Sequence, residues 1–278
     1  MKERTITNKI GYGLMTALAI IIIFIALFPL IWMLISTFKP STEIYSIPLT
    51  LFPQEPTLEN YDIVFQDTAF LRSMLVTALV SGVAVFFSLL VNMLAAYSFA
   101  KMNFYGKGLL WAYCLLTMFI PGMTIQLTSF LVVHRLGMLD TLAVLIIPGL
   151  ASGYSTFFFR QFFASMPQSL DDAAMIDGAS RWKVFFTIYV PLSKGPMVLL
   201  GTGAFIGYWN SFIWPSMTIT NQNLRQIMQL IRAMNSIYAN NDGAVLAGTA
   251  VAILPPIILF LIFHKQIIRS NILTGVKA

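Results

Sequence analysis

Charged residues are scarce in this chain. Only 10% of its 278 residues are Asp, Glu, Lys or Arg, while 58% are hydrophobic. A soluble domain carries about 25% charged residues, so this composition does not supply enough polar surface to face water on all sides. Apolar runs of about 20 residues, the length that crosses a bilayer as a helix, recur along the sequence. The composition therefore predicts an all-α integral membrane protein.

Cysteine and histidine are also rare, and the common catalytic patterns are missing. The single cysteine, Cys114, excludes an internal disulfide, and with only two histidines no zinc-type cluster forms. No G-x-x-x-x-G-K-[ST] phosphate loop occurs, because Gly106-Lys107-Gly108 lacks both the spacing and the following hydroxyl. No Ser-His-Asp, Cys-His or paired-carboxylate arrangement is visible in the apolar runs. The sequence thus predicts neither an enzyme nor a resident cofactor or metal.

Acidic residues are absent from every apolar run. Proton-coupled transporters usually carry acids within their membrane spans, so this absence disfavours a transporter that powers itself. A net charge of +6 is compatible with nucleic acid binding. In a membrane protein, however, the positions of the positive charges determine the orientation of the spans in the membrane. We therefore expect no nucleic acid partner and an energy source outside this chain.

Six membrane spans are predicted within a single transmembrane domain, at about residues 12–36, 72–99, 108–130, 141–163, 197–219 and 245–267. Proline and glycine interrupt several of them and remove backbone hydrogen bonds that lipid cannot replace. The interruptions are Pro121-Gly122, Pro148-Gly149, Pro215 and Pro255-Pro256. Because such breaks are tolerated beside other helices or a water-filled path, they are either ordinary kinks or marks of a pathway.

The distribution of positive charge predicts the orientation of the spans. With the N-terminus inside, 12 of the 17 Lys and Arg residues lie on the cytoplasmic side and 5 on the external side. Positive charges concentrate in cytoplasmic segments, so both termini, including a tail at 268–278, are predicted to be cytoplasmic. The external segment 37–71 is acidic and rich in proline, and it is either a solvated connection or a partner contact.

The cytoplasmic segment 164–196 is a polar island between apolar spans. Ser169 is placed as a helix N-cap, with Asp172 three residues later as the acidic half of a capping box. Asp177-Gly178 predicts a left-handed helix stop, and a second amphipathic stretch then ends at Pro191. The apolar residues of that stretch are Trp182, Phe185, Phe186, Ile188 and Tyr189. Two short helices of this kind either enter a groove on another protein or lie on lipid headgroups.

The pattern Asp172-Ala-Ala-x-x-Asp177-Gly178-Ala179, followed at fixed spacing by Phe185, Ile188 and Pro191, resembles the "EAA" loop of ABC importer permeases. In that family the loop is the coupling helix that docks into a cleft of the ATPase subunit. The resemblance implies that nine residues take part in this coupling: Asp172, Ala173, Ala174, Asp177, Gly178, Ala179, Phe185, Ile188 and Pro191. Asp172 stands where the family usually has glutamate, which keeps the charge but shortens its reach by one methylene.

Further motifs are similar to those of maltose-type sugar-importer permeases, and the C-terminal one is similar to the tail of the smaller subunit. They are Phe28-Pro29-Leu30, Ala95-Ala96-Tyr97, Leu136-Gly137-Met138, Trp209-Asn210-Ser211-Phe212 and the C-terminal Leu273-Thr274-Gly275. The resemblance implies a type I ABC importer permease fold of six transmembrane helices in a bacterial or archaeal cytoplasmic membrane. It implies as partners membrane lipid, a second homologous permease, two ATPase subunits that bind ATP and Mg, and an extracytoplasmic sugar-binding protein that contacts segment 220–243. The implied function is uptake of an oligosaccharide or related polyol by alternating access.

Five polar or amphipathic residues within the spans are candidates for the substrate path: Asn92, Tyr97, Gln126, Trp209 and Asn210. Each side chain can bond to or stack on a sugar. However, Asn and Gln also bond between transmembrane helices, and Tyr and Trp also serve as interfacial residues. Two other functions stay open. One is a permease for a glycerol-phosphate-type solute, and the other is a non-transporting membrane scaffold that recruits a soluble partner.

Overall fold

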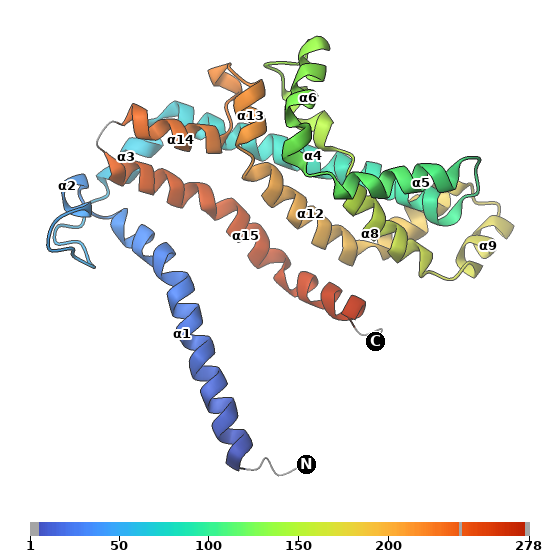
Figure 1. Ribbon diagram of the computed structural model, residues 1–278, viewed down its shortest axis with the longest axis horizontal. Coiled ribbons are helices and arrows are strands. Elements are labelled where there is room, and N and C mark those ends of the chain that lie inside the picture. Colours follow the sequence, from blue (N-terminus) through green and yellow to red (C-terminus); the bar gives the residue numbers. More distant parts are fainter. Residues whose placement is uncertain (1–5, 239–240, 276–278) are drawn as a thin grey trace. The chain divides into compact units, whose positions relative to one another are not determined.

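The computed structural model describes residues 6–238 and 241–275, and among these residues helices and turns occur but no strand (Figure 1). The chain forms two compact units. The smaller unit consists of the residues up to Thr68 together with Ile231–Ala252. The larger unit consists of Ala69–Leu230 together with the residues from Ile253 onward. The helices are α1 (Ile6–Ser36), α2 (Ser41–Ile44), α3 (Glu59–Gln66), α4 (Thr68–Lys101), α5 (Lys107–Leu116), η1 (Thr117–Phe119), α6 (Gly122–Arg135), α7 (Leu142–Ile146), η2 (Ile147–Gly149), α8 (Gly153–Ala164), α9 (Ser169–Ile176), α10 (Arg181–Val184), η3 (Phe185–Tyr189), α11 (Val190–Leu192), α12 (Lys194–Trp209), α13 (Ile213–Thr218), η4 (Gln222–Leu224), α14 (Ile227–Ile237) and α15 (Asp242–Gly275).

Three helices are each long and apolar enough to cross a bilayer: Gly11–Ser36 within α1, all of α4, and Asp242–Ile267 within α15. Three further candidates are pairs of helices that meet at a bend. The stretch α5–η1 meets α6 at 109°, α7–η2 meets α8 at 47°, and Arg181–Leu192 meets α12 at 77°. If each bent pair is one span, the described residues hold six candidate spans.

The bends follow the predicted interruptions only in part. Pro121 and Pro148 lie at breaks, as expected from the hydrogen bond that each proline removes. The expected span 197–219 ends at Trp209 and resumes as α13, which contains Pro215. In contrast, α15 runs unbroken through Pro255-Pro256, because the loss of a hydrogen bond does not by itself end a long helix. The predicted tail 268–278 begins inside α15, and its residues 276–278 lie outside the described residues.

The segment 37–67 of the smaller unit folds back on the end of α1. The Asn60 amide donates to the carbonyl oxygens of Thr37 and Lys39, both at 2.8 Å. The Lys39 side chain is buried, its ammonium donates to the Thr50 carbonyl, and it lies 4.6 Å from the centre of the Trp32 ring. These contacts make the segment a folded part of its unit rather than a loose solvated connection.

A turn in the larger unit is closed by Asp140. This residue has a positive φ of 55°, a conformation in which Asp is several-fold enriched among residues other than glycine. Its carboxylate accepts hydrogen bonds from the hydroxyl and backbone N–H of Thr220, both at 2.6 Å, and from the N–H of Asn221 at 2.7 Å. The Thr220 hydroxyl, followed by the two backbone N–H groups, lowers the pKa of Asp140. The turn before α7 is therefore tied to the chain that follows α13.

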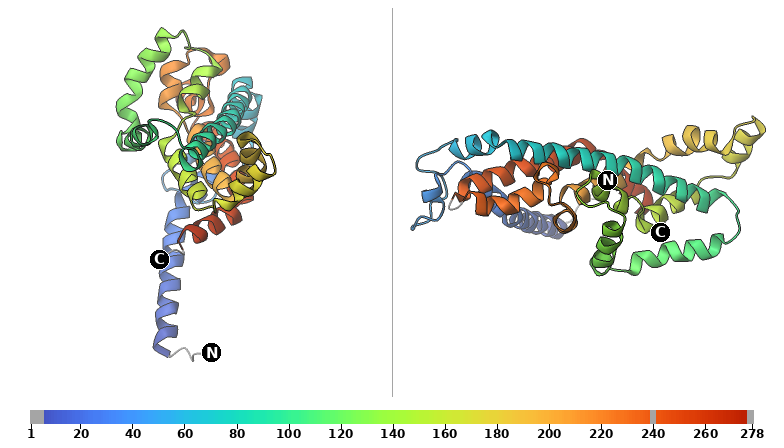
Figure 2. Two further views of the ribbon diagram at one scale, coloured as in Figure 1. Left: turned by 90° about the vertical axis from the view of Figure 1, so that its right-hand side faces the viewer. Right: turned by 90° about the horizontal axis from the view of Figure 1, so that it is seen from above.

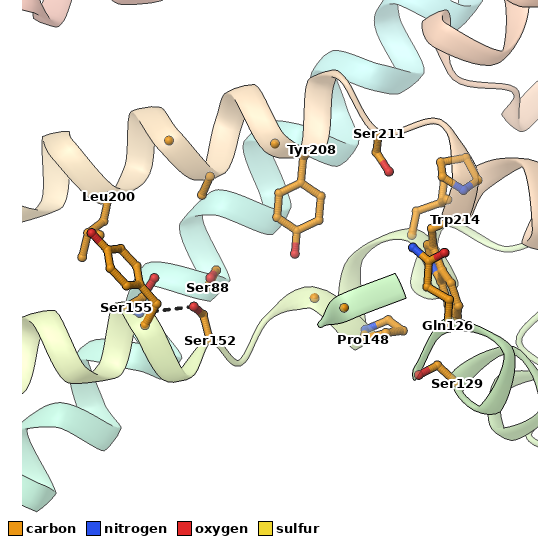
Figure 3. Close-up of a pocket in the computed structure, with 18 of the residues that line it drawn as sticks. Ser88, Gln126, Ser129, Pro148, Ser152, Ser155, Leu200, Tyr208, Ser211 and Trp214 are labelled. Atoms are coloured by element: carbon orange, nitrogen blue, oxygen red, sulfur yellow. Dashed lines mark hydrogen bonds between the residues drawn. The ribbon is translucent and has the colours of Figure 1, made fainter. Parts of the chain in front are cut away.

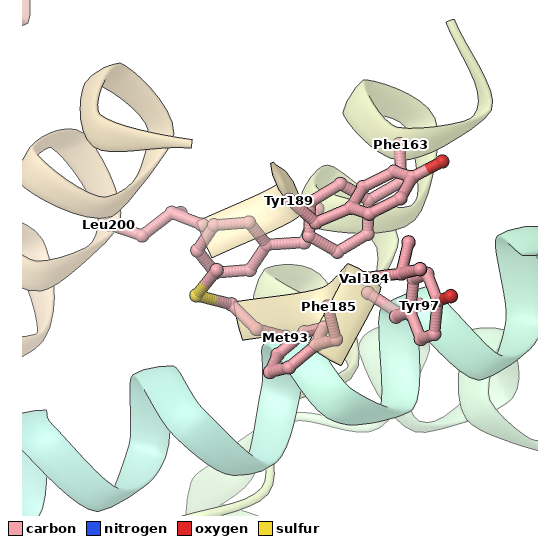
Figure 4. Close-up of a cluster of buried hydrophobic side chains, with 9 residues drawn as sticks. Met93, Tyr97, Phe163, Val184, Phe185, Tyr189 and Leu200 are labelled. Carbon is pink, nitrogen blue, oxygen red and sulfur yellow. The ribbon is translucent and has the colours of Figure 1, made fainter. Parts of the chain in front are cut away.

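The core of the larger unit joins α4, α8, η3 and α12 (Figure 4). The Tyr97 ring of α4 lies 4.9 Å from the Tyr189 ring and 5.4 Å from the Phe185 ring, measured between centroids. The Phe163 ring of α8 meets Tyr189 edge-on at 5.2 Å. Aromatic pairs at such distances add about 0.5–1.5 kcal/mol beyond the apolar area that they bury. The core therefore fixes the second half of the segment 164–196 to two membrane-spanning helices.

Asn92 on α4 forms hydrogen bonds with backbone groups at the break between α7–η2 and α8. Its amide donates to the Leu150 carbonyl at 2.8 Å, and its carbonyl oxygen accepts from the Ser152 N–H at 2.8 Å and from the Thr156 hydroxyl at 2.9 Å. Asn92 is 1% exposed, so water is not available to replace these bonds. The side chain thus supplies the partners that a continuous helix would have supplied.

We predict that Asn92→Leu destabilises the chain. Each buried polar group left without a partner costs about 1–3 kcal/mol, and the substitution removes the partner of Ser152 N–H and one partner each of Leu150 and Thr156. The temperature of thermal unfolding in detergent should fall by several degrees. Val91→Leu, on the exposed side of the same helix, is the matched control. An unchanged unfolding temperature in Asn92→Leu would contradict the role of this side chain.

Candidate functional site

The first half of the segment 164–196 is a short helix that ends in a left-handed turn. Helix α9 begins at Ser169, but its N-cap is Gln168 and no side-chain capping bond forms, so the predicted capping role of Ser169 is wrong. Gly178 has a φ of 76°, as predicted, and the Ala179 N–H donates to the Ala174 carbonyl at 2.9 Å. The helix therefore stops at a turn that favours glycine.

The residues around this turn form an exposed tip. Asp172, Ala173, Asp177 and Gly178 are all exposed within this chain, and Figure 1 and the right-hand view of Figure 2 show α9 at one end of the larger unit. Apolar side chains are exposed beside them. They are Leu170, Met175, Ile176, Trp182 and Phe186, of which Ile176 is 86% exposed. Apolar side chains of this size gathered at a tip mark an interaction surface.

The other predicted coupling residues form the base of the segment instead. Phe185 is buried in the core of the larger unit, and Ala174, Ala179 and Ile188 pack against that core. Pro191 is exposed and lies in the short helix α11, so the second stretch continues to Leu192 rather than ending at Pro191. The nine residues of the motif therefore divide into an exposed tip and a base that holds the tip in place.

Asp171 attaches α9 to the rest of the larger unit through Lys101 and Tyr189. Its carboxylate is buried, lies 3.6 Å from the Lys101 ammonium at the end of α4, and accepts a hydrogen bond from the Tyr189 hydroxyl. The Lys101 ammonium also donates to the Met166 carbonyl at 2.9 Å. One carboxylate thus ties the tip helix to a membrane-spanning helix and to the aromatic core. Sequence reasoning gave Asp171 only a helix-dipole role and favoured its neighbour Asp172, which is exposed.

A cavity of about 820 Å3 lies elsewhere in the same unit (Figure 3). Three of the predicted proline and glycine interruptions meet in its wall, through Gly122, Pro148-Gly149 and Pro215. Helices α4, α8 and α12 also line the cavity, through Ser88, Ser155 and Tyr208 among others. The breaks are therefore gathered around one space, where backbone groups not bonded within a helix are tolerated.

Of the five predicted substrate-path residues, only Gln126 lines the cavity. Asn92 holds the broken backbone, and Tyr97 belongs to the aromatic core. Trp209 is buried and its ring stacks 5.5 Å from that of Phe205, while Asn210 is exposed at the end of α12. The four residues other than Gln126 are therefore not part of the cavity wall.

Sequence reasoning missed several polar residues of the wall. Tyr208 on α12 points across the cavity toward the η2 stretch (Figure 3), and Gln226 lines the cavity with its side chain buried. A signal was available on α12, because Gly203 and Gly207 lie four residues apart and Ser211 follows just past the end of the helix. This spacing puts small residues on one helix face, and that face lines the cavity.

We predict that Asp171→Asn weakens the attachment of α9. An asparagine still accepts from Tyr189, but it leaves the buried Lys101 ammonium without its counter-ion, which costs about 3–5 kcal/mol when one partner of a buried pair is removed. Thermal unfolding in detergent measures this loss. Asp172→Asn, a change of the same kind at the exposed neighbour, should leave the unfolding temperature unchanged.

The double variant Lys101→Met/Asp171→Asn checks the assignment. Because it removes both charges, it should lose less stability than the two single variants added together. Strictly additive losses would mean that the two side chains do not interact.

The sequence of this chain matches that of a known protein family. Residues 88–271 match the family described as binding-protein-dependent transport system inner membrane component. This stretch runs from the first cavity residue on α4 through the segment 164–196 and into α15. It therefore includes the whole of the candidate site.

Two curated relatives match nearly the whole chain. The arabinooligosaccharides transport system permease protein AraQ of Halalkalibacterium halodurans is 30% identical over 280 residues, with 100% of each chain covered. The sn-glycerol-3-phosphate transport system permease protein UgpE of Pectobacterium atrosepticum is 30% identical, with 95% of this chain and 98% of that chain covered. Both are named as permeases, which are transport components and not enzymes.

A solved structure shares the fold. It is a chain of a bacterial ABC transporter involved in the import of the acidic polysaccharide alginate, with a TM-score of 0.85 at 21% identity, covering 95% of this chain and 99% of that one. The all-helical architecture with bent spans is thus that of an ABC importer permease. With two thirds of its length matched, the chain belongs to the family of inner membrane components of binding-protein-dependent transport systems.

Proposed function

We propose that this chain is the permease subunit of an ATP-driven importer that takes up an oligosaccharide or related polyol. The family match carries this proposal, and the full-length similarity to a permease named for arabinooligosaccharides supports the substrate class. An extracytoplasmic binding protein delivers the solute, and the external segment 220–243 receives that protein. The permease then alternates between outward- and inward-facing states.

The exposed tip of α9 couples the permease to an ATPase subunit in this proposal. A helix that enters a groove needs apolar anchors on its exposed face, and Met175 and Ile176 meet this need. A coupling element also needs a stiff base, which the core residues Phe185 and Tyr189 provide. ATP and Mg bind on the ATPase, and this chain passes the resulting movement to its membrane-spanning helices.

The remaining partners follow from the exposed apolar surface of α1. All side chains from Gly11 to Leu30 are exposed within this chain, and apolar surface of this extent needs lipid or another helix to cover it. We assign this surface to membrane lipid and to a second, homologous permease. Two permeases and two ATPase subunits then form the importer, in the cytoplasmic membrane of a bacterium or archaeon, with both termini of this chain cytoplasmic.

A second candidate is uptake of a glycerol-phosphate ester. It is favoured by the similarity to the permease named for sn-glycerol 3-phosphate, which matches the AraQ relative in identity and nearly in coverage. Uptake into vesicles that contain the reconstituted importer separates the two candidates. Uptake of neutral oligosaccharide supports the first, uptake of sn-glycerol 3-phosphate alone supports the second, and a protein that moves neither while binding the ATPase is a scaffold.

We predict that Gly178→Leu uncouples ATP hydrolysis from transport. The leucine is strained at a φ of 76°, at a cost of about 1–3 kcal/mol, and the tip must change shape to relieve this strain. Solute-stimulated ATPase activity and uptake should both fall, while the protein remains in the membrane. Gly106→Leu is the matched control, because Gly106 has the same φ in the turn before α5, outside the segment 164–196, and its Cβ would meet no atom within 4 Å.

Ile176→Asp tests the same surface without straining the backbone. This side chain is 86% exposed, so the change removes a contact with the partner and not one within the chain. Normal solute-stimulated ATPase activity in both Gly178→Leu and Ile176→Asp would overturn the coupling role of the tip.

A further inference from the structure

Two polar atoms in the wall of the cavity lack hydrogen-bond partners. Within the described part of the chain, neither the Tyr208 hydroxyl nor the Gln226 side-chain carbonyl oxygen has one, although both atoms are buried. Gln226 as a whole is 1% exposed. An unsatisfied buried polar group costs about 1–3 kcal/mol, and such groups in a native protein call for an explanation. Both residues belong to the wall of the same cavity.

The Tyr208 hydroxyl occupies the space that a side chain at Gly149 would fill. A Cβ at Gly149 would overlap this hydroxyl, and Figure 3 shows Tyr208 directed toward the stretch that contains Pro148. Since only glycine leaves this space open, the break at Pro148-Gly149 does more than bend the span. It admits a hydroxyl group into the cavity wall at a defined position.

The wall as a whole is uncharged, and its mainly apolar surface carries several hydroxyl and amide groups. Among the described residues that line the cavity, none is Asp, Glu, Lys, Arg or His, and the polar groups are hydroxyls and amides. Placing an unpaired anion in such a space is costly, because a buried charge needs a counter-charge as well as hydrogen bonds. A phosphate or carboxylate ligand therefore finds no cation here. A neutral ligand with many hydroxyl groups finds donors and acceptors.

The size and the aromatic content of the cavity agree with such a ligand. Its volume of about 820 Å3 is within the range of small-molecule sites, about 300–1,000 Å3. The rings of Tyr154, Phe158 and Trp214 also line it. Aromatic rings stack against the C–H faces of a sugar ring, while hydroxyl and amide groups form hydrogen bonds with the sugar hydroxyl groups.

We propose that this cavity binds an uncharged, polyhydroxylated solute such as a neutral oligosaccharide. In this site the Tyr208 hydroxyl donates to the solute and the Gln226 carbonyl oxygen accepts from it, while Gly149 sets the position of Tyr208. The proposal rests on the proposed function for the identity of the solute as the transported one. It adds that this subunit contacts the solute directly and that the site selects against anions, including sn-glycerol 3-phosphate.

Equilibrium binding to the detergent-solubilised importer complex tests the site. The probes are radiolabelled arabinotriose, a neutral oligosaccharide, and radiolabelled sn-glycerol 3-phosphate. Tyr208→Phe and Gln226→Leu each remove one hydrogen bond to the ligand, worth about 1 kcal/mol or roughly a fivefold change in Kd. Both variants should weaken arabinotriose binding by this factor, and the wild-type complex should bind the phosphate ester more weakly than arabinotriose.

A glycine variant moves the hydroxyl without removing it. In Gly149→Ala the new methyl group displaces the Tyr208 side chain, so arabinotriose binding should weaken as in Tyr208→Phe. Gly82→Ala and Tyr113→Phe are the matched controls, because both residues lie outside the cavity wall, a Cβ at Gly82 would meet no atom within 4 Å, and Tyr113 is 69% exposed. Both controls should bind arabinotriose like the wild type.

The outcomes separate this site from the proposed function. Unchanged arabinotriose binding in Tyr208→Phe, Gln226→Leu and Gly149→Ala overturns the site, even if the complex imports the sugar. Equal or tighter binding of sn-glycerol 3-phosphate overturns the selection against anions. If the wild-type complex binds arabinotriose through these residues but shows no ATP-dependent uptake of it into vesicles, the site stands and the proposed function fails.

Discussion

Every backbone N–H and C=O group inside a membrane must find a partner within the protein, and this constraint governs the larger unit. The chain breaks its helices at Pro121 and Pro148, yet the freed groups near Pro148 are not left to lipid. Asn92 bonds to Leu150, Ser152 and Thr156 across the break. The break leaves glycine at 149, and this glycine makes room for Tyr208. The buried Asn92 side chain thus supplies hydrogen bonds to the chain beside the break at Pro148-Gly149, whose residues line the cavity.

The segment 164–196 obeys a different constraint, that of presenting an exposed surface without losing its shape. Eight-residue helices are not stable alone in water, so α9 depends on what holds it. Asp171 connects it to Lys101 and Tyr189, and the aromatic rings below fix Tyr189 against Tyr97. Of the motif residues, Asp172, Ala173, Asp177 and Gly178 lie at the tip, while Ala174, Ala179, Phe185 and Ile188 belong to the base.

Sequence reasoning reached the features that depend on local pattern. Hydropathy placed the long helices, and Gly178 predicted the positive φ that the structure shows. Features that depend on which faces meet were beyond it. Asp171 and Asp172 are neighbours of the same type in one helix turn, and only packing decides that the first is buried. Asn92 and Tyr97 looked like ligand-binding residues because their chemistry suits a sugar, but partners within the chain use that chemistry. Tyr208 has the same chemistry as Tyr97, but its position in the cavity wall depends on the space beside Gly149, which the sequence does not reveal.

One helix connects the two parts of the candidate site. On α4, Ser88 lines the cavity, Asn92 holds the break, Tyr97 enters the core and Lys101 reaches Asp171. The 14 residues from Ser88 to Lys101 span about 20 Å at a rise of 1.5 Å per residue, and they lie in one unbroken helix. A displacement of α9 therefore acts on α4 through a buried ion pair and an aromatic core, both of which resist compression. The same helix carries the amide that holds the cavity wall, so movement at the tip and the shape of the cavity share one rigid element.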